Sequence, residues 1–192
     1  MAFLSYYLAM IYQRRKLFIG LPLSPALRKR LTREIGEWPK EAIIPTREEN
    51  LHITLMFLGY VYEDQIPEVT EKLIEATEGV PFFELHFTKM ELLDSEENPK
   101  MIWLTGEPSE ELKNLHERIE KAFSSFVTER KAYRPHITLA KTKKPKWLAL
   151  PKKPILKDSL SLMESIDSVV LFESLDIEGK RHYEPIDTFP LA

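Results

Sequence analysis

The chain has 192 residues, of which 43% are hydrophobic and 30% charged, and its formal net charge is −3. This composition is typical of an ordinary globular protein and excludes a disordered or membrane-spanning one, and the length suits one large domain or two small lobes that share a core. There is no cysteine, which excludes disulfides, thiolate metal sites and a cysteine nucleophile.

Residues 1–12 are apolar and aromatic, but this run is too short to span a bilayer. Its basic residues, Arg14, Arg15 and Lys16, follow the apolar run, whereas those of a signal peptide precede it. We therefore expect a cytoplasmic protein without a membrane anchor. Translation could start at Met10 as well as at Met1.

The first half of the chain alternates strand and helix signals. Ser24 and Pro25 are typical of a helix N-cap and first turn, and apolar residues follow them at helical spacing. In chain order we expect a strand at 17–21, a helix from Ser24 to about Trp38, a strand at 51–58 that Gly59 closes, an amphipathic helix over 66–76 and a strand at 82–90.

The second half repeats this plan. Pro108 and Ser109 are typical of a helix start. The expected elements are a strand at 101–105, a helix over 110–126, a motif strand from His136, an irregular lysine-rich stretch at 141–157, and strands at 160–163, 168–175 and 182–188 with a turn at Glu178–Gly179.

The tetrapeptide His-Ile-Thr-Leu occurs twice, at 52–55 and 136–139. The offset of 84 residues between the copies also carries Leu17 onto Met101 and Leu31 onto Leu115. Strand, helix and motif strand thus recur in register. This predicts two similar halves related by an approximate two-fold axis.

Side chains alternate along a strand, so His52 and Thr54 share one face, as do His136 and Thr138. Facing halves would bring two imidazoles and two hydroxyls into one cleft. A neutral histidine can accept a proton near pH 7 and a protonated one can donate it, each role being worth roughly 10² to 10⁴ in rate. Threonine hydroxyls can donate to non-bridging phosphate oxygens. This constellation suits a phosphodiester and needs no metal.

Other interpretations stay open for the same residues. A single His-x-Thr is more often structural than catalytic, and we treat His86, His116 and His182 as structural or exposed. A zinc site usually takes three protein ligands, and no acidic residue lies within the motif strands. The window 130–157 holds ten basic residues and no acidic one, which fits either a solvated loop or a positive wall for a phosphate ligand.

At the motif strands the sequence resembles the two-histidine (2H) phosphoesterase superfamily, in particular the RNA 2',3'-cyclic phosphodiesterases once named 2'-5' RNA ligases. The resemblance spans about 16–191, and the matching segments are 16–22, 49–59, 133–140 and 171–174. It implies a bilobal α+β fold with the motifs on adjacent central strands. The expected boundaries are one domain over 1–192, with lobe 1 roughly 14–90 and lobe 2 roughly 101–192, whose C-terminal segment completes the sheets.

The resemblance further implies hydrolysis of a terminal 2',3'-cyclic phosphate to a 2'-phosphate, with joining of RNA ends as the reverse reaction. His136 is expected as the proton acceptor and His52 as the donor, Thr54 and Thr138 as phosphate ligands, and Arg134 and Lys141 as further substrate contacts. No metal or cofactor is implied, and the partner is an RNA or nucleotide bound by a monomer. Lys141 stands where the family usually has arginine, so a bidentate contact is lost.

Two rival functions use the same residues. One keeps the site but changes the bond, as in cleavage of 2'-5' oligonucleotides or trimming of RNA 3' ends. The other is a noncatalytic binder of RNA ends that uses the basic window, in which Lys141 and Lys144 would matter more than the histidines.

Overall fold

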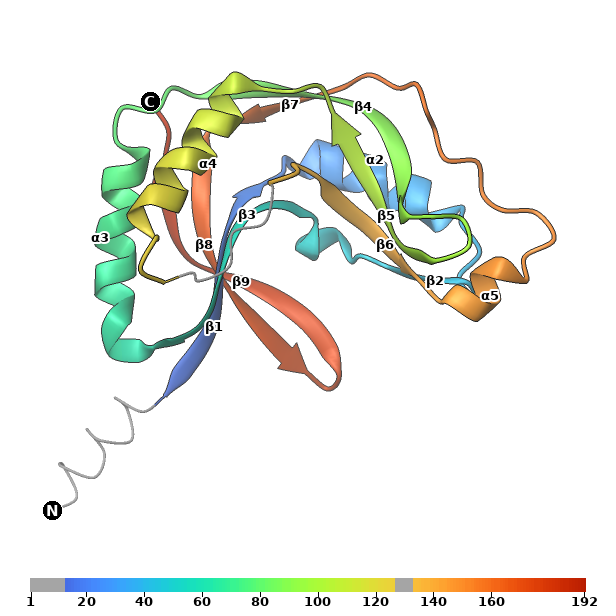
Figure 1. Cartoon of the computed structure of the whole chain (residues 1–192), viewed down its shortest axis with the longest axis horizontal. Helices are drawn as coiled ribbons and strands as arrows, with labels where there is room; N and C mark the ends of the chain where they lie inside the picture. Colours follow the sequence, from blue (N-terminus) through green and yellow to red (C-terminus); the bar gives the residue numbers. More distant parts are fainter. Residues whose placement is uncertain (1–12, 127–132) are drawn as a thin grey trace, which may run out of the picture.

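A computed structural model of the chain describes residues 13–126 and 133–192. Its elements are β1 (Arg14–Pro22), α2 (Pro25–Gly36), β2 (Ile43–Pro45), η1 (Glu48–Asn50), β3 (His52–Tyr62), η2 (Glu63–Gln65), α3 (Ile66–Thr77), β4 (Phe83–Asp94), β5 (Pro99–Gly106), α4 (Glu110–Ala122), β6 (Ile137–Thr142), α5 (Lys144–Leu148), β7 (Leu162–Ile166), β8 (Ser168–Ile177) and β9 (Lys180–Pro190) (Figure 1).

The described strands form one curled antiparallel sheet in the order β7-β4-β5-β6-β3-β1-β8-β9, and β2 pairs with β6. The two motif strands, β3 and β6, are therefore neighbours at its centre. β4 crosses from the first half of the chain to pair with β5 and β7, whereas β8 pairs with β1 from the first half. The expected α+β class with adjacent central motif strands is confirmed.

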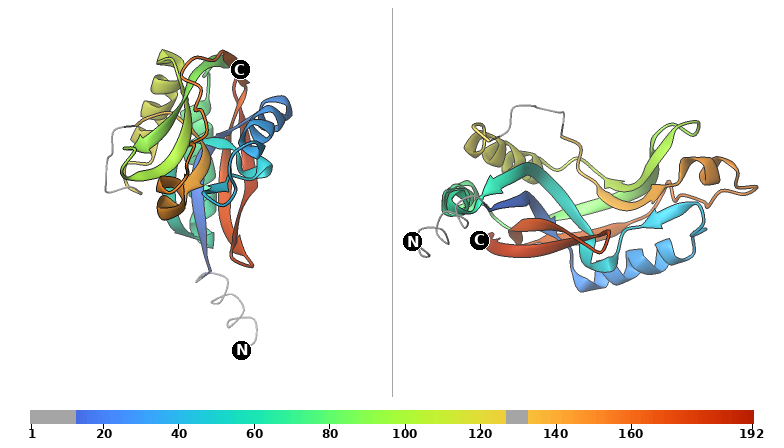
Figure 2. Two further views of the ribbon diagram at one scale, coloured as in Figure 1. Left: turned by 90° about the vertical axis from the view of Figure 1, so that its right-hand side faces the viewer. Right: turned by 90° about the horizontal axis from the view of Figure 1, so that it is seen from below.

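The first helix of each half of the chain contacts the motif strand of the other half. The helix of the first half, α2, contacts β6, and that of the second half, α4, contacts β3 and packs on α3. Figure 1 shows α3 and α4 together at one end of the molecule and α2 at the other, and Figure 2 shows the same separation from below. No described helix is long and apolar enough to cross a membrane.

Both predicted N-caps are confirmed. The hydroxyl of Ser24 accepts a hydrogen bond from the backbone N–H of Leu27 at 3.2 Å, and that of Ser109 from the N–H of Leu112 at 3.1 Å. The hydroxyl of Ser24 also donates to the buried carboxylate of Glu164 on β7 at 2.9 Å, which ties the start of α2 to the sheet.

Some boundaries differ from the prediction: α4 ends at Ala122 and not at 126, and β7 covers Leu162–Ile166 and not 160–163. Two other predictions are also wrong. Gly59 does not close the motif strand, since β3 continues to Tyr62. Gly59 takes a φ of 76°, which glycine adopts easily, within the strand. The stretch 141–157 is not wholly irregular, because α5 forms over Lys144–Leu148 and buries Trp147. The turn at Glu178–Gly179 is confirmed, with φ values of 53° and 73°.

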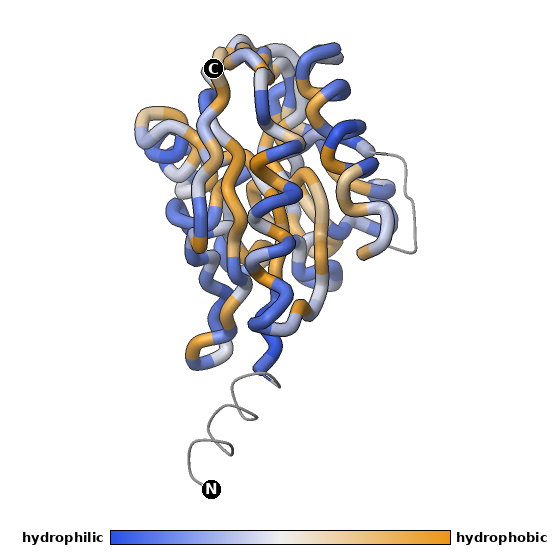
Figure 3. Tube along the Cα trace, turned by 90° about the vertical axis from the view of Figure 1, so that its left-hand side faces the viewer, coloured by the Kyte–Doolittle hydropathy of each residue, from blue (hydrophilic) through white to orange (hydrophobic). Residues whose placement is uncertain are grey.

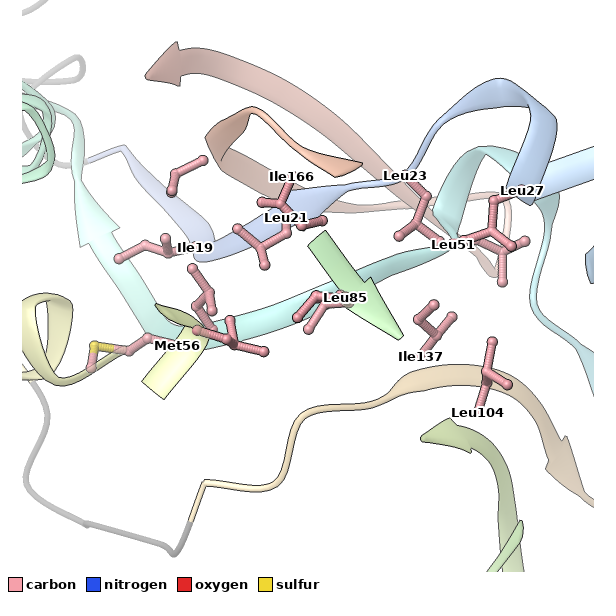
Figure 4. Close-up of a cluster of buried hydrophobic side chains, with 14 of the residues drawn as sticks. Ile19, Leu21, Leu23, Leu27, Leu51, Met56, Leu85, Leu104, Ile137 and Ile166 are labelled. Carbon is pink, nitrogen blue, oxygen red and sulfur yellow. The ribbon is translucent and has the colours of Figure 1, made fainter. Parts of the chain in front are cut away.

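The core lies between the sheet and its helices. Leu17, Ile19 and Leu21 of β1 alternate into it beside Ile53 and Ile137 of the motif strands, all 0–1% exposed. Figure 4 shows several of these side chains in one cluster, and Figure 3 shows long hydrophobic stretches along strands and a mixture of hydrophobic and hydrophilic colour along the helices. The opposite face of the central strands carries the polar motif side chains.

Candidate functional site

The register between β3 and β6 brings the two motifs together. Ile53 pairs with Ile137 in an antiparallel ladder. In such a ladder the neighbouring positions oppose each other in the reverse order, so His52 lies across from Thr138 and Thr54 across from His136. β6 begins at Ile137, so His136 stands immediately before its strand. All four predicted motif side chains thus gather on one face.

Both imidazoles are held in the same way. Nδ1 of His52 donates to the carbonyl oxygen of Asn50 at 2.7 Å, and Nδ1 of His136 donates to that of Arg134 at 2.7 Å. A carbonyl can only accept, so each Nδ1 carries a hydrogen and each neutral ring presents the lone pair of Nε2. Nε2 is therefore the atom through which either ring can take up or give a proton.

His52 packs among aromatic rings. Its ring centroid is 4.9 Å from Phe18 and 5.0 Å from Tyr183, which meets it edge-on. Nε2 lies 2.8 Å from the hydroxyl of Thr54, which donates to it when the ring is neutral. Burial lowers the pKa of His52 to about 4, and the nearby charge of His136 acts in the same direction.

Glycine at position 20 makes room for the His52 ring. A Cβ atom there would lie 2.9 Å from the carbonyl oxygen of Ile53 and 3.3 Å from Cδ2 of His52. Any larger residue would therefore push on the imidazole from behind.

His136 has a different support. Trp103 stacks on its ring with the centroids 3.6 Å apart and the planes at 17°. The guanidinium of Arg134 lies 5.5 Å from the Trp103 ring and donates to Glu91 at 2.6 Å. Burial lowers the pKa of His136, and the charge of Arg134 lowers it further. Arg134, predicted as a substrate contact, thus has an ion-pair partner within the protein.

Glu91 anchors this side of the site. It pairs with Trp103 across β4 and β5 and accepts a hydrogen bond from the hydroxyl of Thr105 at 2.8 Å. Partial burial raises the pKa of Glu91, but the hydrogen bonds from Thr105 and Lys89 and the charge of Arg134 outweigh it, so its pKa lies below the ordinary value. An ionised Glu91 holds Arg134 in place.

Asn50 joins His52 to the β8–β9 hairpin. Its buried side chain donates to the carbonyl of Arg181 at 2.8 Å and accepts from the N–H of Tyr183 at 3.1 Å. Its backbone carbonyl is the acceptor for Nδ1 of His52. One residue therefore orients the imidazole and fixes the strand that carries Tyr183.

A bulge in β3 changes which residues face the site. Thr54 pairs with Gly20, yet Met56 pairs with Ile19, the next residue of β1, so the alternation of faces reverses between them. Met56 enters the core, and Phe57 returns to the face of His52.

An equivalent bulge in β6 changes the face on which Lys141 lies. Thr138 pairs with Trp103, Ala140 with Ile102 and Lys141 with Met101. Because Met101 and Trp103 share a face of β5, Lys141 lies on the same face as Thr138. The predicted substrate contact Lys141 is therefore on the site face, at the position equivalent to Phe57.

These pairings correct one predicted equivalence. Phe18 pairs with Phe57 and Met101 with Lys141, so Phe18, not Leu17, is the counterpart of Met101. The repeat offset is 84 residues between the motif strands but 83 residues between β1 and β5.

The basic window is partly neutralised by the fold. Besides the Arg134–Glu91 pair, Lys153 lies 3.7 Å from Glu96, and Lys157 lies close to Glu34. These carboxylates come from α2, β4 and the β4–β5 connection. Residues 130–132 of the window lie outside the described residues. The window is therefore neither a uniform positive wall nor a free loop.

Known proteins share this arrangement. The sequence pattern of the 2'-5' RNA ligase superfamily matches residues 24–176, most of the chain. The chain belongs to this superfamily. It is 31% identical over 130 residues to the RNA 2',3'-cyclic phosphodiesterase of Thermotoga maritima, covering 66% of this chain and 69% of that protein. With that of Geobacillus stearothermophilus it shares 28% identity over 189 residues, covering 93% of this chain and 58% of that protein.

Solved structures agree in fold. A protein of Thermus thermophilus superposes with a TM-score of 0.79 at 23% identity, covering 93% of this chain and 98% of that one. LigT of Escherichia coli, crystallised with 3'-AMP, gives a TM-score of 0.78 at 20% identity, covering 93% and 99%. At these identities the likeness shows the fold alone.

In this superfamily member, the motif pattern missed the residues that support the histidines: Gly20, Asn50, Glu91, Trp103 and Tyr183. One signal was present in the sequence, because Asn50 and Arg134 each precede their histidine by two residues. The others come from strands distant in sequence. Within 13–126 and 133–192 no group of three or more histidine, aspartate or glutamate side chains is arranged to hold a metal ion.

Proposed function

We propose that the protein is a metal-independent RNA 2',3'-cyclic phosphodiesterase. The observation that carries this proposal is the Ile53–Ile137 pairing, which places two His-Thr pairs on one face with each histidine across from the other motif's threonine. Relatives named RNA 2',3'-cyclic phosphodiesterase, such as those of Thermotoga maritima and Bacillus subtilis, support the substrate.

In the proposed hydrolysis, water attacks the phosphorus of the cyclic phosphate. Nε2 of neutral His136 accepts the proton of the water, and Nε2–H of His52 donates a proton to the departing O3' as the P–O3' bond breaks. The product is a 2'-phosphate with a free 3'-hydroxyl. Thr54 and Thr138 donate to the non-bridging oxygens, where negative charge gathers.

The donor role of His52 depends on the substrate. With a pKa of about 4, His52 is neutral near pH 7 in the free protein. A phosphodiester anion beside the ring favours its protonated form and raises the pKa. An NMR titration of the His52 ring with and without inorganic phosphate tests this. If phosphate leaves the pKa unchanged, the proposed donor role of His52 is contradicted.

Two further contacts are proposed from the geometry. Lys141 lies on the site face and supplies a positive charge for the phosphate group. Arg134 is held by Glu91 above Trp103, so its guanidinium acts on the substrate from a fixed position. The protein is proposed to act as a monomer, because one chain supplies every residue of this site.

The test is turnover of a short RNA that ends in a 2',3'-cyclic phosphate, with the product identified by chromatography. Wild-type protein should form the 2'-phosphate in the presence of EDTA, and His52→Ala and His136→Ala should each lose roughly 10² to 10⁴ in rate. His86→Ala is the matched control, because this histidine lies on β4, outside the two motif strands, and bonds Ser161 just before the edge strand β7. Activity that chelation removes and zinc restores would contradict the proposal.

The same assay separates the other candidates. Joining of a 5'-hydroxyl end to the cyclic phosphate is the microscopic reverse and exchanges the roles of the two histidines. Cleavage of 2'-5' linked oligonucleotides or of linear 3' ends would appear on a panel of such substrates. Salt-dependent binding without turnover, weakened by Lys141→Ala and Lys144→Ala and unaffected by the histidine variants, would indicate a binder of RNA ends.

A further inference from the structure

The site face continues along β1 and β3 beyond the motif residues. Going away from the Gly20–Thr54 pair, the paired positions are Phe18 with Phe57, Lys16 with Tyr60, and Arg14 with Tyr62. Figure 1 shows β1 and β3 side by side along this length. Gly20 and Arg14 are six residues apart, which corresponds to about 20 Å of strand. We call Phe57, Tyr60, Tyr62, Arg14 and Lys16 the aromatic-basic row.

The aromatic members of the row are open to solvent. Phe57 is 68% exposed, Tyr60 66% and Tyr62 40%. Large aromatic side chains on a central sheet face normally pack against a covering layer. Three exposed rings in succession form a surface on which planar groups can stack.

The basic members lie among these rings. The guanidinium of Arg14 is 5.6 Å from the Tyr60 ring and 5.8 Å from the Tyr62 ring, and Nζ of Lys16 is 5.9 Å from the Tyr60 ring. β1 and β3 contain no acidic residue. By contrast, Arg15, which points to the other face, forms an ion pair with Glu173 at 2.6 Å. Neither strand therefore contributes a negative charge to the row.

We propose that the aromatic-basic row binds the single-stranded RNA that precedes the terminal cyclic phosphate. Exposed rings with interleaved cations are the combination that holds single-stranded nucleic acid without sequence preference, since bases stack on the rings and phosphates meet the cations. The row is continuous with the face of His52 and Thr54, so a strand whose 3' end lies between the histidines can continue along it. This inference rests on the proposed function and extends it to the length of the substrate.

The proposal predicts a preference for oligonucleotides over mononucleotides. The experiment compares kcat/KM for a nucleoside 2',3'-cyclic phosphate with that for a single-stranded RNA of roughly six nucleotides ending in the same group. The wild type should favour the oligonucleotide. Tyr60→Ala and Tyr62→Ala should each lower kcat/KM for the oligonucleotide by roughly 5-fold to 100-fold, through KM, and leave the mononucleotide unaffected.

A matched control is Phe82→Ala, because Phe82 is an aromatic residue of similar exposure (65%) that precedes β4 and lies outside the row. It should change neither substrate. For the charges, Arg14→Gln and Lys16→Gln should each reduce the slope of log affinity against log salt by about 1. Arg30→Gln, at an exposed position of α2 outside the row, is the corresponding control and should leave the slope unchanged.

Equal effects of Tyr60→Ala on both substrates, or no effect on either, would overturn the proposal. The proposal would also be overturned if Tyr60→Ala changed the oligomeric state seen by sedimentation and kept the preference for the oligonucleotide. The row would then be a contact between copies of the chain. Failure of the proposed function looks different. In that case the wild type hydrolyses neither substrate, while anisotropy measurements still show oligonucleotide binding that Tyr60→Ala weakens.

Discussion

Ile53 and Ile137 lie directly opposite each other on β3 and β6, and both side chains are 0% exposed. Each is the second residue of a His-Ile-Thr-Leu motif. Their side chains point into the core, so the residues on either side of each point to the other face. This one pairing therefore decides which polar side chains meet, and it sets each histidine against the threonine of the other motif.

Loss of either threonine hydroxyl should slow turnover without unfolding the protein. Thr54→Val and Thr138→Val remove a proposed donor to the phosphate, and we expect kcat to fall by about 10² to 10³. Thr54→Ser and Thr138→Ser keep the hydroxyl and should keep most of the rate. Steady-state kinetics on the cyclic phosphate substrate measures both pairs. Equal rates for the valine and serine variants would show that the hydroxyls do not act on the substrate.

Alanine at Gly20 should impair the site more than the fold. Its Cβ would press on the carbonyl of Ile53 and on the His52 ring, and a displacement of about 1 Å can cost on the order of 10²-fold in rate. The control is Gly36→Ala at the end of α2, where nothing lies within 4 Å of the added Cβ and activity should be unchanged. Kinetics together with thermal unfolding separates the two effects. Full activity of Gly20→Ala would contradict the close packing behind His52.

Protonation of His52 should destabilise the protein in mild acid. Its folded-state pKa of about 4 lies below the unfolded value of about 6.5, so the unfolded chain binds more protons between these values. Stability is complete above about pH 6.5 and falls as the pH drops towards 4, by about 3 kcal/mol from this residue. Urea unfolding at several pH values measures it.

The matched variant for the pH series is His52→Gln, which has no titrating ring. Its free energy of unfolding should fall less than that of the wild type between pH 6.5 and 4. Parallel curves for the two proteins would show that the ring titrates alike in the folded and unfolded states.

Asn50 should act as a positioning residue for His52. Asn50→Asp keeps an acceptor for the N–H of Tyr183 but loses the donor to the carbonyl of Arg181, so we expect a loss of about 1–3 kcal/mol in stability. Movement of η1 would also alter the Asn50 carbonyl that holds Nδ1 of His52. The readout is the NMR pKa of His52, which should shift, together with kcat. An unchanged His52 pKa in a destabilised variant would limit Asn50 to a structural role.

The local elements followed from local signals. Ser24 and Ser109 cap their helices because a serine hydroxyl satisfies a free N–H of the first turn, and this needs only neighbouring residues. The end of β3 was misplaced for a tertiary reason: Gly59 can also sit within a strand when pairing with β1 carries the chain through it. The helix α5 was missed because burial of Trp147, and not a long periodic pattern, stabilises it.

The residues around the two histidines could be predicted from the sequence only in part. Alternation within a strand predicts the face of Thr54 and Thr138, but it fails after the bulges, so the faces of Phe57 and Lys141 could not be read from the sequence. Trp103 reaches His136 only through the pairing of β5 with β6, and Tyr183 reaches His52 through the hairpin that Asn50 holds. These contacts join residues far apart in the chain.

The sequence by itself determined the chemistry at the centre: two imidazoles and two hydroxyls, repeated at a fixed spacing on strands whose apolar residues must be buried. Burial of Ile53 and Ile137 then forces the polar side chains to the opposite face. The tertiary structure alone decided the surroundings, namely which ring stacks on which histidine, which carboxylate neutralises Arg134, and which aromatic residues of β3 stay exposed. Those outcomes depend on strand order, register and bulges, which arise from pairing between distant segments.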